Sequence, residues 1–110
     1  MRIALDLDGT LWQYKTFFRE LAWALTKAGH EVGILTGHAG GKEADLHQLE
    51  LQGFPPPAFF INGDGRDVEG DHKTWKQVRA KANGVDVLFD DWGVFGAVEC
   101  WVNGPKEQQG

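Results

Sequence analysis

The feature that most constrains this chain is a series of short apolar runs, separated by segments long enough for one helix. The five runs span residues 2–7, 31–36, 58–62, 85–90 and 97–103. The first four are nearly continuous in apolar residues, which is typical of strands buried on both faces of a parallel sheet. Consecutive parallel strands need a crossover connection, which is usually a helix. We therefore expect a helix between each of the first four runs and the next.

The segments between these runs have the predicted helical character. The three segments are residues 14–29, 41–52 and 71–84. Each ends at a glycine or directly before one (Gly29, Gly53 and Gly84), and glycine favours a helix C-terminus. Apolar residues recur at i, i+3 and i+4 in the first of them, as in an amphipathic helix. In the third, we expect Trp75, Val78 and Ala82 to share the face that packs on the sheet. The alternation of strands and helices predicts an α/β fold with right-handed crossovers.

The totals restrict the class of protein further. A length of 110 residues favours one domain, and a net charge of −5 argues against a protein that mainly coats nucleic acid. No apolar segment is long enough to span a membrane, and no secretory signal opens the chain. The single cysteine, Cys100, cannot form an internal disulfide and suits a reducing compartment. We expect a cytoplasmic protein without membrane contact.

Carboxylates follow two of the predicted strands. Asp6 and Asp8 end the first run, and Asp90 and Asp91 end the fourth. The carboxyl ends of parallel strands are where α/β proteins bind ligands, so we expect these acids to converge there. Converging carboxylates repel one another unless a cation joins them. Oxygen ligands alone suit Mg²⁺, which takes one or two carboxylates together with waters and phosphate.

Two further residue types complete a site for phosphoryl transfer. Thr36 and Gly37 end the second run and offer a hydroxyl and a backbone N–H to a phosphoryl oxygen. A lysine is needed to offset the negative charge that develops during the transfer. Lys73 and Lys76, both in the third predicted helix, are the candidates.

These residues resemble the motifs of the haloacid dehalogenase (HAD) superfamily. The stretch DLDGTL at residues 6–11 is similar to the first motif of the family, DxDxT followed by an apolar residue. Thr36 is similar to the second motif, Lys73 or Lys76 to the third, and LFDDW at residues 88–92 to the fourth. The four motifs occur in the family order.

The resemblance implies roles for the acidic residues. Asp6 would be the nucleophile that forms an aspartyl-phosphate, and Asp8 the general acid and base. Mg²⁺ would be held by Asp6, by the backbone carbonyl of Asp8 and by Asp90 or Asp91, with Asp91 slightly favoured. An acid at the position of Asp8 favours a phosphatase over a dehalogenase.

The resemblance also implies roles for the remaining residues. The lysine would neutralise Asp6 and the phosphate, and placement at the start of the helix favours Lys73 over Lys76. Gly9, Thr10, Thr36 and Gly37 would surround the substrate.

Aromatic residues lie close to both acidic strand ends. Trp12 and Trp92 lie just past these ends, and we expect them to pack against the protein rather than to stack on a substrate ring. His38 is more readily interpreted as a solvated loop residue than as a substrate contact.

The expected fold is therefore a three-layer Rossmann-like sandwich with a central, mainly parallel five-stranded sheet. Residues 1–110 would form a single HAD-like hydrolase domain without a cap, because the segments between the motifs are too short for one. The expected function is Mg²⁺-dependent hydrolysis of a phosphomonoester of unknown size. Three alternatives stay open: a nucleotidase, a polynucleotide-end phosphatase, or a phosphate-binding member with vestigial catalysis. Whether the chain forms a homo-oligomer also stays open.

Overall fold

The structure is a computed structural model that describes residues 1–37, 41–62 and 72–90, with side chains in the last range from Trp75 onward. Four of the predicted strands lie in these ranges: β1 (Arg2–Leu5), β2 (Glu31–Thr36), β3 (Phe60–Asn62) and β4 (Val87–Phe89). The predicted strand over residues 97–103 lies outside the described residues.

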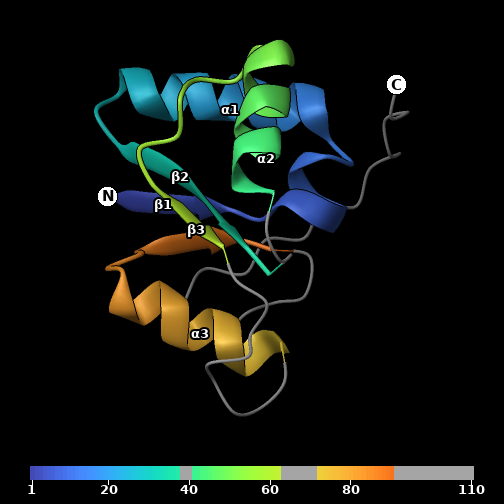
Figure 1. Cartoon of the computed structure of the whole chain (residues 1–110). Coiled ribbons are helices and arrows are strands. Elements are labelled where there is room, and N and C mark those ends of the chain that lie inside the picture. Colours follow the sequence, from blue (N-terminus) through green and yellow to red (C-terminus); the bar gives the residue numbers. More distant parts are fainter. Residues whose placement is uncertain (38–40, 63–71, 91–110) are drawn as a thin grey trace.

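These four strands form one parallel sheet in the order β3-β2-β1-β4 (Figure 1). Leu5 of the central strand β1 is in register with Ile34 of β2 and with Phe89 of β4. The predicted α/β fold with a parallel sheet is therefore confirmed for the described residues. The chain runs outward from β1 to β3 and then returns to the other side of β1. The strand order thus reverses between β1 and β4, where open α/β sheets commonly bind their ligands.

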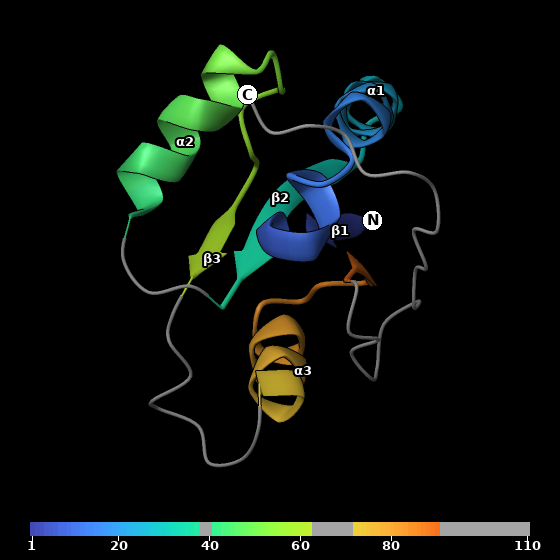
Figure 2. The same cartoon turned by 90° about the vertical axis from the view of Figure 1, so that its right-hand side faces the viewer.

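Helices cover both faces of this sheet. Helices α1 (Lys15–Lys27) and α2 (Lys42–Leu51) lie on one face, and α3 (His72–Ala82) lies on the opposite face (Figure 2). Their ends agree with the sequence prediction to within two residues. Gly29, which follows α1, has a φ of +95°, a left-handed conformation that glycine adopts without the steric cost of a side chain. None of the helices in the described part of the chain is long and apolar enough to cross a membrane.

In the described part of the chain, a hydrophobic cluster packs on each face of the sheet. On the side of α1 and α2, Leu5 and Ile34 pack with Phe18 of α1 and with other apolar side chains. On the side of α3, Ala4 and Leu35 pack with residues of the helix, among them Trp75. Consecutive strand residues point to opposite faces, so the near-continuous apolar runs are explained by burial on both sides.

The face that α3 presents to the sheet differs from the prediction. Trp75 is buried as expected, but Val78 is 46% exposed and Ala82 is also exposed. The prediction for these two residues was wrong. The helix is turned so that Lys76 and Ala80 are buried together with Trp75. A lysine is almost never fully buried unless it is paired, so apolar periodicity alone could not orient this helix.

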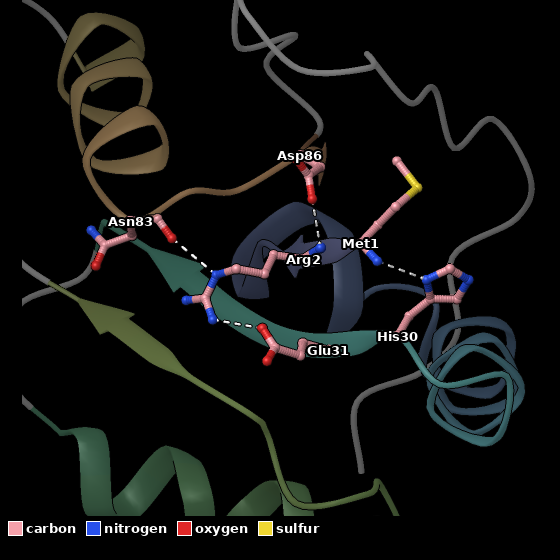
Figure 3. Close-up of polar contacts among 6 residues, drawn as sticks. All are labelled: Met1, Arg2, His30, Glu31, Asn83 and Asp86. Atoms are coloured by element: carbon pink, nitrogen blue, oxygen red, sulfur yellow. Dashed lines mark hydrogen bonds and ion pairs between the residues drawn. The ribbon is translucent and has the colours of Figure 1, made fainter.

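Polar contacts of Arg2 link neighbouring segments at the amino-terminal edge of the sheet, which is opposite to the predicted site. The guanidinium of Arg2 donates to the carbonyl of Asn83 at 2.9 Å and to Oε2 of Glu31 at 2.7 Å (Figure 3). The backbone N–H of Arg2 donates to Oδ2 of Asp86 at 2.8 Å. Arg2 therefore connects β1 to the start of β2 and to the turn between α3 and β4.

Candidate active site

Polar residues from three neighbouring strands meet at the carboxyl edge of the sheet. Asp6 directly follows β1, Asp90 directly follows β4, and Thr36 is the last residue of β2; all three side chains are buried. The backbone N–H of Asp6 donates to the carbonyl of Phe89 at 3.0 Å, which holds the ends of β1 and β4 together. Asp6 and Asp90 thus lie at the point where the strand order reverses.

A tight turn, η1 (Leu7–Leu11), follows Asp6 and carries the rest of the first motif. The N–H of Leu11 donates to the carbonyl of Asp6 at 3.2 Å, and the N–H of Trp12 donates to the carbonyl of Leu7 at 3.0 Å. Gly9 has a φ of +81°, which residues with a side chain adopt only at a steric cost. Glycine at this position lets the chain reverse directly above the strand end.

The two acids of the first motif have different surroundings. Asp6 is buried, whereas Asp8 is exposed and has an extended backbone conformation, with φ −71° and ψ 131°. Leu7 between them packs into the core on the side of α1 and α2. Asp8 is therefore the acid of this pair that solvent reaches.

The ammonium of Lys76 joins the two buried carboxylates. Its Nζ lies 2.5 Å from Oδ1 of Asp6 and also donates a hydrogen bond to Oδ2 of Asp90. Only 1% of the Lys76 side chain is exposed. Two carboxylates and one ammonium have a formal net charge of −1, so the cation offsets part of a repulsion that water does not screen here.

The fold explains how Lys76 reaches this place. Helix α3 begins at the carboxyl edge of the sheet, and helical side chains tilt toward the helix N-terminus. Leu5 and Phe89 both pack on the side of α1 and α2, so the next residue on each strand, Asp6 or Asp90, is directed toward the side of α3. A lysine one turn into α3 therefore has both carboxylates within reach.

Thr10 supports the same carboxylate from the other side. Its hydroxyl donates to Oδ2 of Asp6 at 3.2 Å, and its side chain is buried. Thr10 and Lys76 thus donate to different oxygens of the Asp6 carboxylate. The resemblance placed Thr10 beside the substrate, whereas the described contact is one that orients Asp6.

The structure places the other predicted site residues as follows. Gly9, which follows Asp8, and Gly37, which follows Thr36, are both half-buried. Trp12 is half-buried and packs against the core cluster that contains Leu7, as the packing interpretation predicts. Three residues lie outside the described part of the chain: His38, Asp91 and Trp92.

The preference for Lys73 does not agree with the contacts that the structure describes. The lysine that contacts Asp6 is Lys76, one turn further into α3. Nothing is described of the Lys73 side chain. The signal that could have favoured Lys76 is its position directly after Trp75, on the part of the helix that packs on the sheet.

One residue of this edge was not singled out from the sequence. Asn62, the last residue of β3, is half-buried and in register with Thr36. A polar residue at the end of the apolar run of β3 is the signal that could have identified it, because the carboxyl ends of these strands form the expected site.

The donor atoms at this edge fit a hard cation. Asp6 and Asp90 provide carboxylate oxygens, which suit Mg²⁺, in addition to their contacts with Lys76 and Thr10. Among the residues that the structure describes, no group of three or more His, Cys, Asp or Glu comes together. Mg²⁺ does not require such a group, because it takes one or two carboxylates and completes its shell with waters and phosphate.

Comparisons of this chain with protein-family models, with curated proteins and with solved structures returned no match.

Proposed function

We propose that this chain is a Mg²⁺-dependent phosphomonoester hydrolase of the HAD type. The observation that carries the proposal is the buried contact of Lys76 with both Asp6 and Asp90 at the carboxyl edge of a parallel sheet. A carboxylate fixed in this way is oriented for attack, and a neighbouring ammonium offsets the charge that a phosphate group brings. The motif order around these residues supports the same assignment.

Asp6 is the nucleophile in this proposal. One of its carboxylate oxygens attacks phosphorus, the bond from phosphorus to the ester oxygen breaks, and an aspartyl-phosphate forms. Asp8, which is exposed next to it, donates a proton to the departing oxygen. Asp8 then takes a proton from the water that attacks phosphorus, and cleavage of the aspartyl-phosphate releases phosphate and restores Asp6.

The remaining site residues hold the reacting groups. The hydroxyl of Thr36 and the backbone N–H of Gly37 bind phosphoryl oxygens, and Lys76 rather than Lys73 balances the charge. The residues that would hold Mg²⁺ are Asp6, Asp8 through its backbone carbonyl, and Asp90 or Asp91. The ion would supply positive charge next to the phosphoryl oxygens.

The proposal extends to the fold around the site. Residues 97–103 add a fifth strand, and the whole chain forms one three-layer domain that lacks a cap. The enzyme works in the cytoplasm on a phosphorylated substrate. The net charge of −5 disfavours long nucleic acids as that substrate.

Hydrolysis of p-nitrophenyl phosphate tests this proposal. The wild type should release p-nitrophenol with Mg²⁺ and not with EDTA, and Asp6→Asn should lower the rate by at least about a thousandfold because the nucleophile is lost. The matched control is Asp86→Asn, since Asp86 lies at the opposite edge of the sheet. Hydrolysis that survives in Asp6→Asn would contradict the proposed nucleophile.

A generic ester can fail to fit a narrow site, so binding provides a second test. Beryllofluoride with Mg²⁺ mimics a phosphoryl group on a carboxylate, and we expect it to raise the thermal midpoint of the wild type and not of Asp6→Asn. Binding without hydrolysis of any ester in a panel of phosphorylated metabolites and nucleotides would favour a vestigial family member over an enzyme.

A further inference from the structure

We propose that a pocket beside α2 binds a small organic cation that combines an apolar ring with an ammonium group. The pocket shares no residue with the candidate active site. The inference therefore goes beyond the proposed function and does not depend on it.

The pocket lies on the face of the sheet that α1 and α2 cover (Figure 2). Its lining includes Trp23 in the second half of α1, Leu46 and Glu50 of α2, and residues 53–57, which connect α2 to β3. The volume is about 480 Å³. Pockets that bind small molecules have this size and a mainly apolar lining with few polar groups.

The walls of the pocket are held in place before a ligand binds. The indole Nε1 of Trp23 donates to the carbonyl of Gly53 at 2.7 Å, which orients the ring. The N–H of Phe54 donates to the carbonyl of Leu49 at 3.0 Å and ties the connection to the end of α2. Residues 55–57 are prolines, whose rings fix φ. A wall that is already ordered loses little conformational entropy on binding.

The charged group of the pocket is an acid. Leu46 and Glu50 are four residues apart, so their side chains lie on the same face of α2. Within the described part of the chain, the Glu50 carboxylate has no hydrogen bond or ion pair. None of the lining residues that the structure describes is basic. Arg19 of α1 donates to the carbonyl of Gln52 at 3.1 Å and does not line the pocket.

This lining selects the chemistry of the ligand. The face of a tryptophan ring attracts cations more strongly than that of any other side chain, and Trp23 is 40% exposed. An ammonium group can therefore interact with the indole and with the Glu50 carboxylate, while an apolar ring packs on Leu46 and the prolines. An anion would be repelled by Glu50 and by the net charge of −5.

Three ligands of similar shape and different charge test the inference. They are phenethylamine, which is a cation at neutral pH, phenethyl alcohol, which is neutral, and hydrocinnamate, which is an anion. Binding to the full chain is measured by NMR titration of the Trp23 indole N–H signal, which is identified by its loss in Trp23→Phe. Glu50→Gln and Glu50→Lys change the charge of the pocket, and both should fold because Glu50 is exposed. The matched control is Glu43→Gln, in the first turn of α2 and outside the pocket.

We expect phenethylamine to bind the wild type with a Kd on the order of 1 mM, as for a fragment of this size. It should bind about fivefold more tightly than phenethyl alcohol, the scale of one exposed charge pair together with a cation–π contact. Glu50→Gln should abolish this preference, Glu50→Lys should make hydrocinnamate the tightest of the three ligands, and Glu43→Gln should behave as the wild type.

Three results would overturn the inference. The first is a Trp23 signal that does not shift at concentrations of amine up to about ten times the expected Kd. The second is a wild type that binds the amine and the alcohol equally. The third is a preference for the amine that persists in Glu50→Gln or falls equally in Glu50→Gln and Glu43→Gln. None of these results bears on the proposed hydrolysis, which has its own tests.

Discussion

Lys76 and Asp6 form a buried ion pair, with Nζ 2.5 Å from Oδ1, between residues that are 70 positions apart in the chain. The same ammonium contacts Asp90, so one side chain of α3 links the ends of β1 and β4. Neither carboxylate could remain charged in this place at low cost without that cation. The pair therefore contributes to the architecture of the site as well as to its proposed chemistry.

Replacing Lys76 with methionine should destabilise the protein strongly. The change leaves two buried carboxylates without their cation, and breaking a buried pair in this way costs about 3–5 kcal/mol. Lys81→Met, on the exposed part of the same helix, should change the free energy of unfolding by less than about 1 kcal/mol, because an exposed charge contributes little even when it is paired. Urea denaturation of both variants measures the difference, and equal values would contradict the role of the buried cation.

The same substitution should separate the two candidate lysines in catalysis. At a temperature where all variants are folded, Lys76→Met should lower kcat for p-nitrophenyl phosphate by at least about a hundredfold, the scale of removing one group that stabilises developing charge. Lys73→Met should retain most of the activity. The reverse result would restore Lys73 as the catalytic lysine.

Mg²⁺ should stabilise the folded protein because the unfolded chain does not hold the site together. At a concentration about a hundred times Kd, the expected gain in the free energy of unfolding is about 2.7 kcal/mol. Thermal melts with Mg²⁺ and with EDTA, at matched ionic strength, measure it. Asp6→Asn should lose most of the gain and Asp86→Asn should keep it; a gain of the same size in both variants would place the ion elsewhere.

Thr10 should act through the orientation of Asp6. Thr10→Val keeps the shape of the side chain but removes the donor to Oδ2 of Asp6, so kcat should fall about tenfold while KM changes little. Thr10→Ser restores a hydroxyl and should recover much of kcat. If Thr10→Val instead raised KM with kcat unchanged, Thr10 would bind substrate, as the resemblance alone implies.

Gly33 in the middle of β2 should not tolerate a side chain. A Cβ there would lie 2.5 Å from the ring and from the backbone carbonyl of Phe59, and such overpacking costs about 1–3 kcal/mol or more. Gly29→Ala is the contrasting variant, because a Cβ at Gly29 meets nothing within 4 Å. Its cost should come from its φ of +95° alone, about 1 kcal/mol. Urea denaturation should rank Gly33→Ala as the less stable variant.

Local sequence patterns were sufficient for most of the described fold. The apolar runs and the helical periodicity placed four strands and three helices, with the bounds of β2 correct to the residue. Glycines marked the helix ends, at Gly29 for example, because a left-handed residue there favours glycine. Those signals depend on neighbours in the chain, which is why a single sequence contains them.

The sequence by itself determined the parallel α/β class and the presence of acids at the ends of β1 and β4. Only the tertiary structure decided which face of α3 packs on the sheet, that Lys76 is the lysine on Asp6 and Asp90, and that Asn62 lies beside Thr36. The physical reason is that a buried lysine is stabilised by carboxylates far away in the chain, and a strand register by pairing with another strand. Neither interaction produces a periodic pattern in the residues that make it.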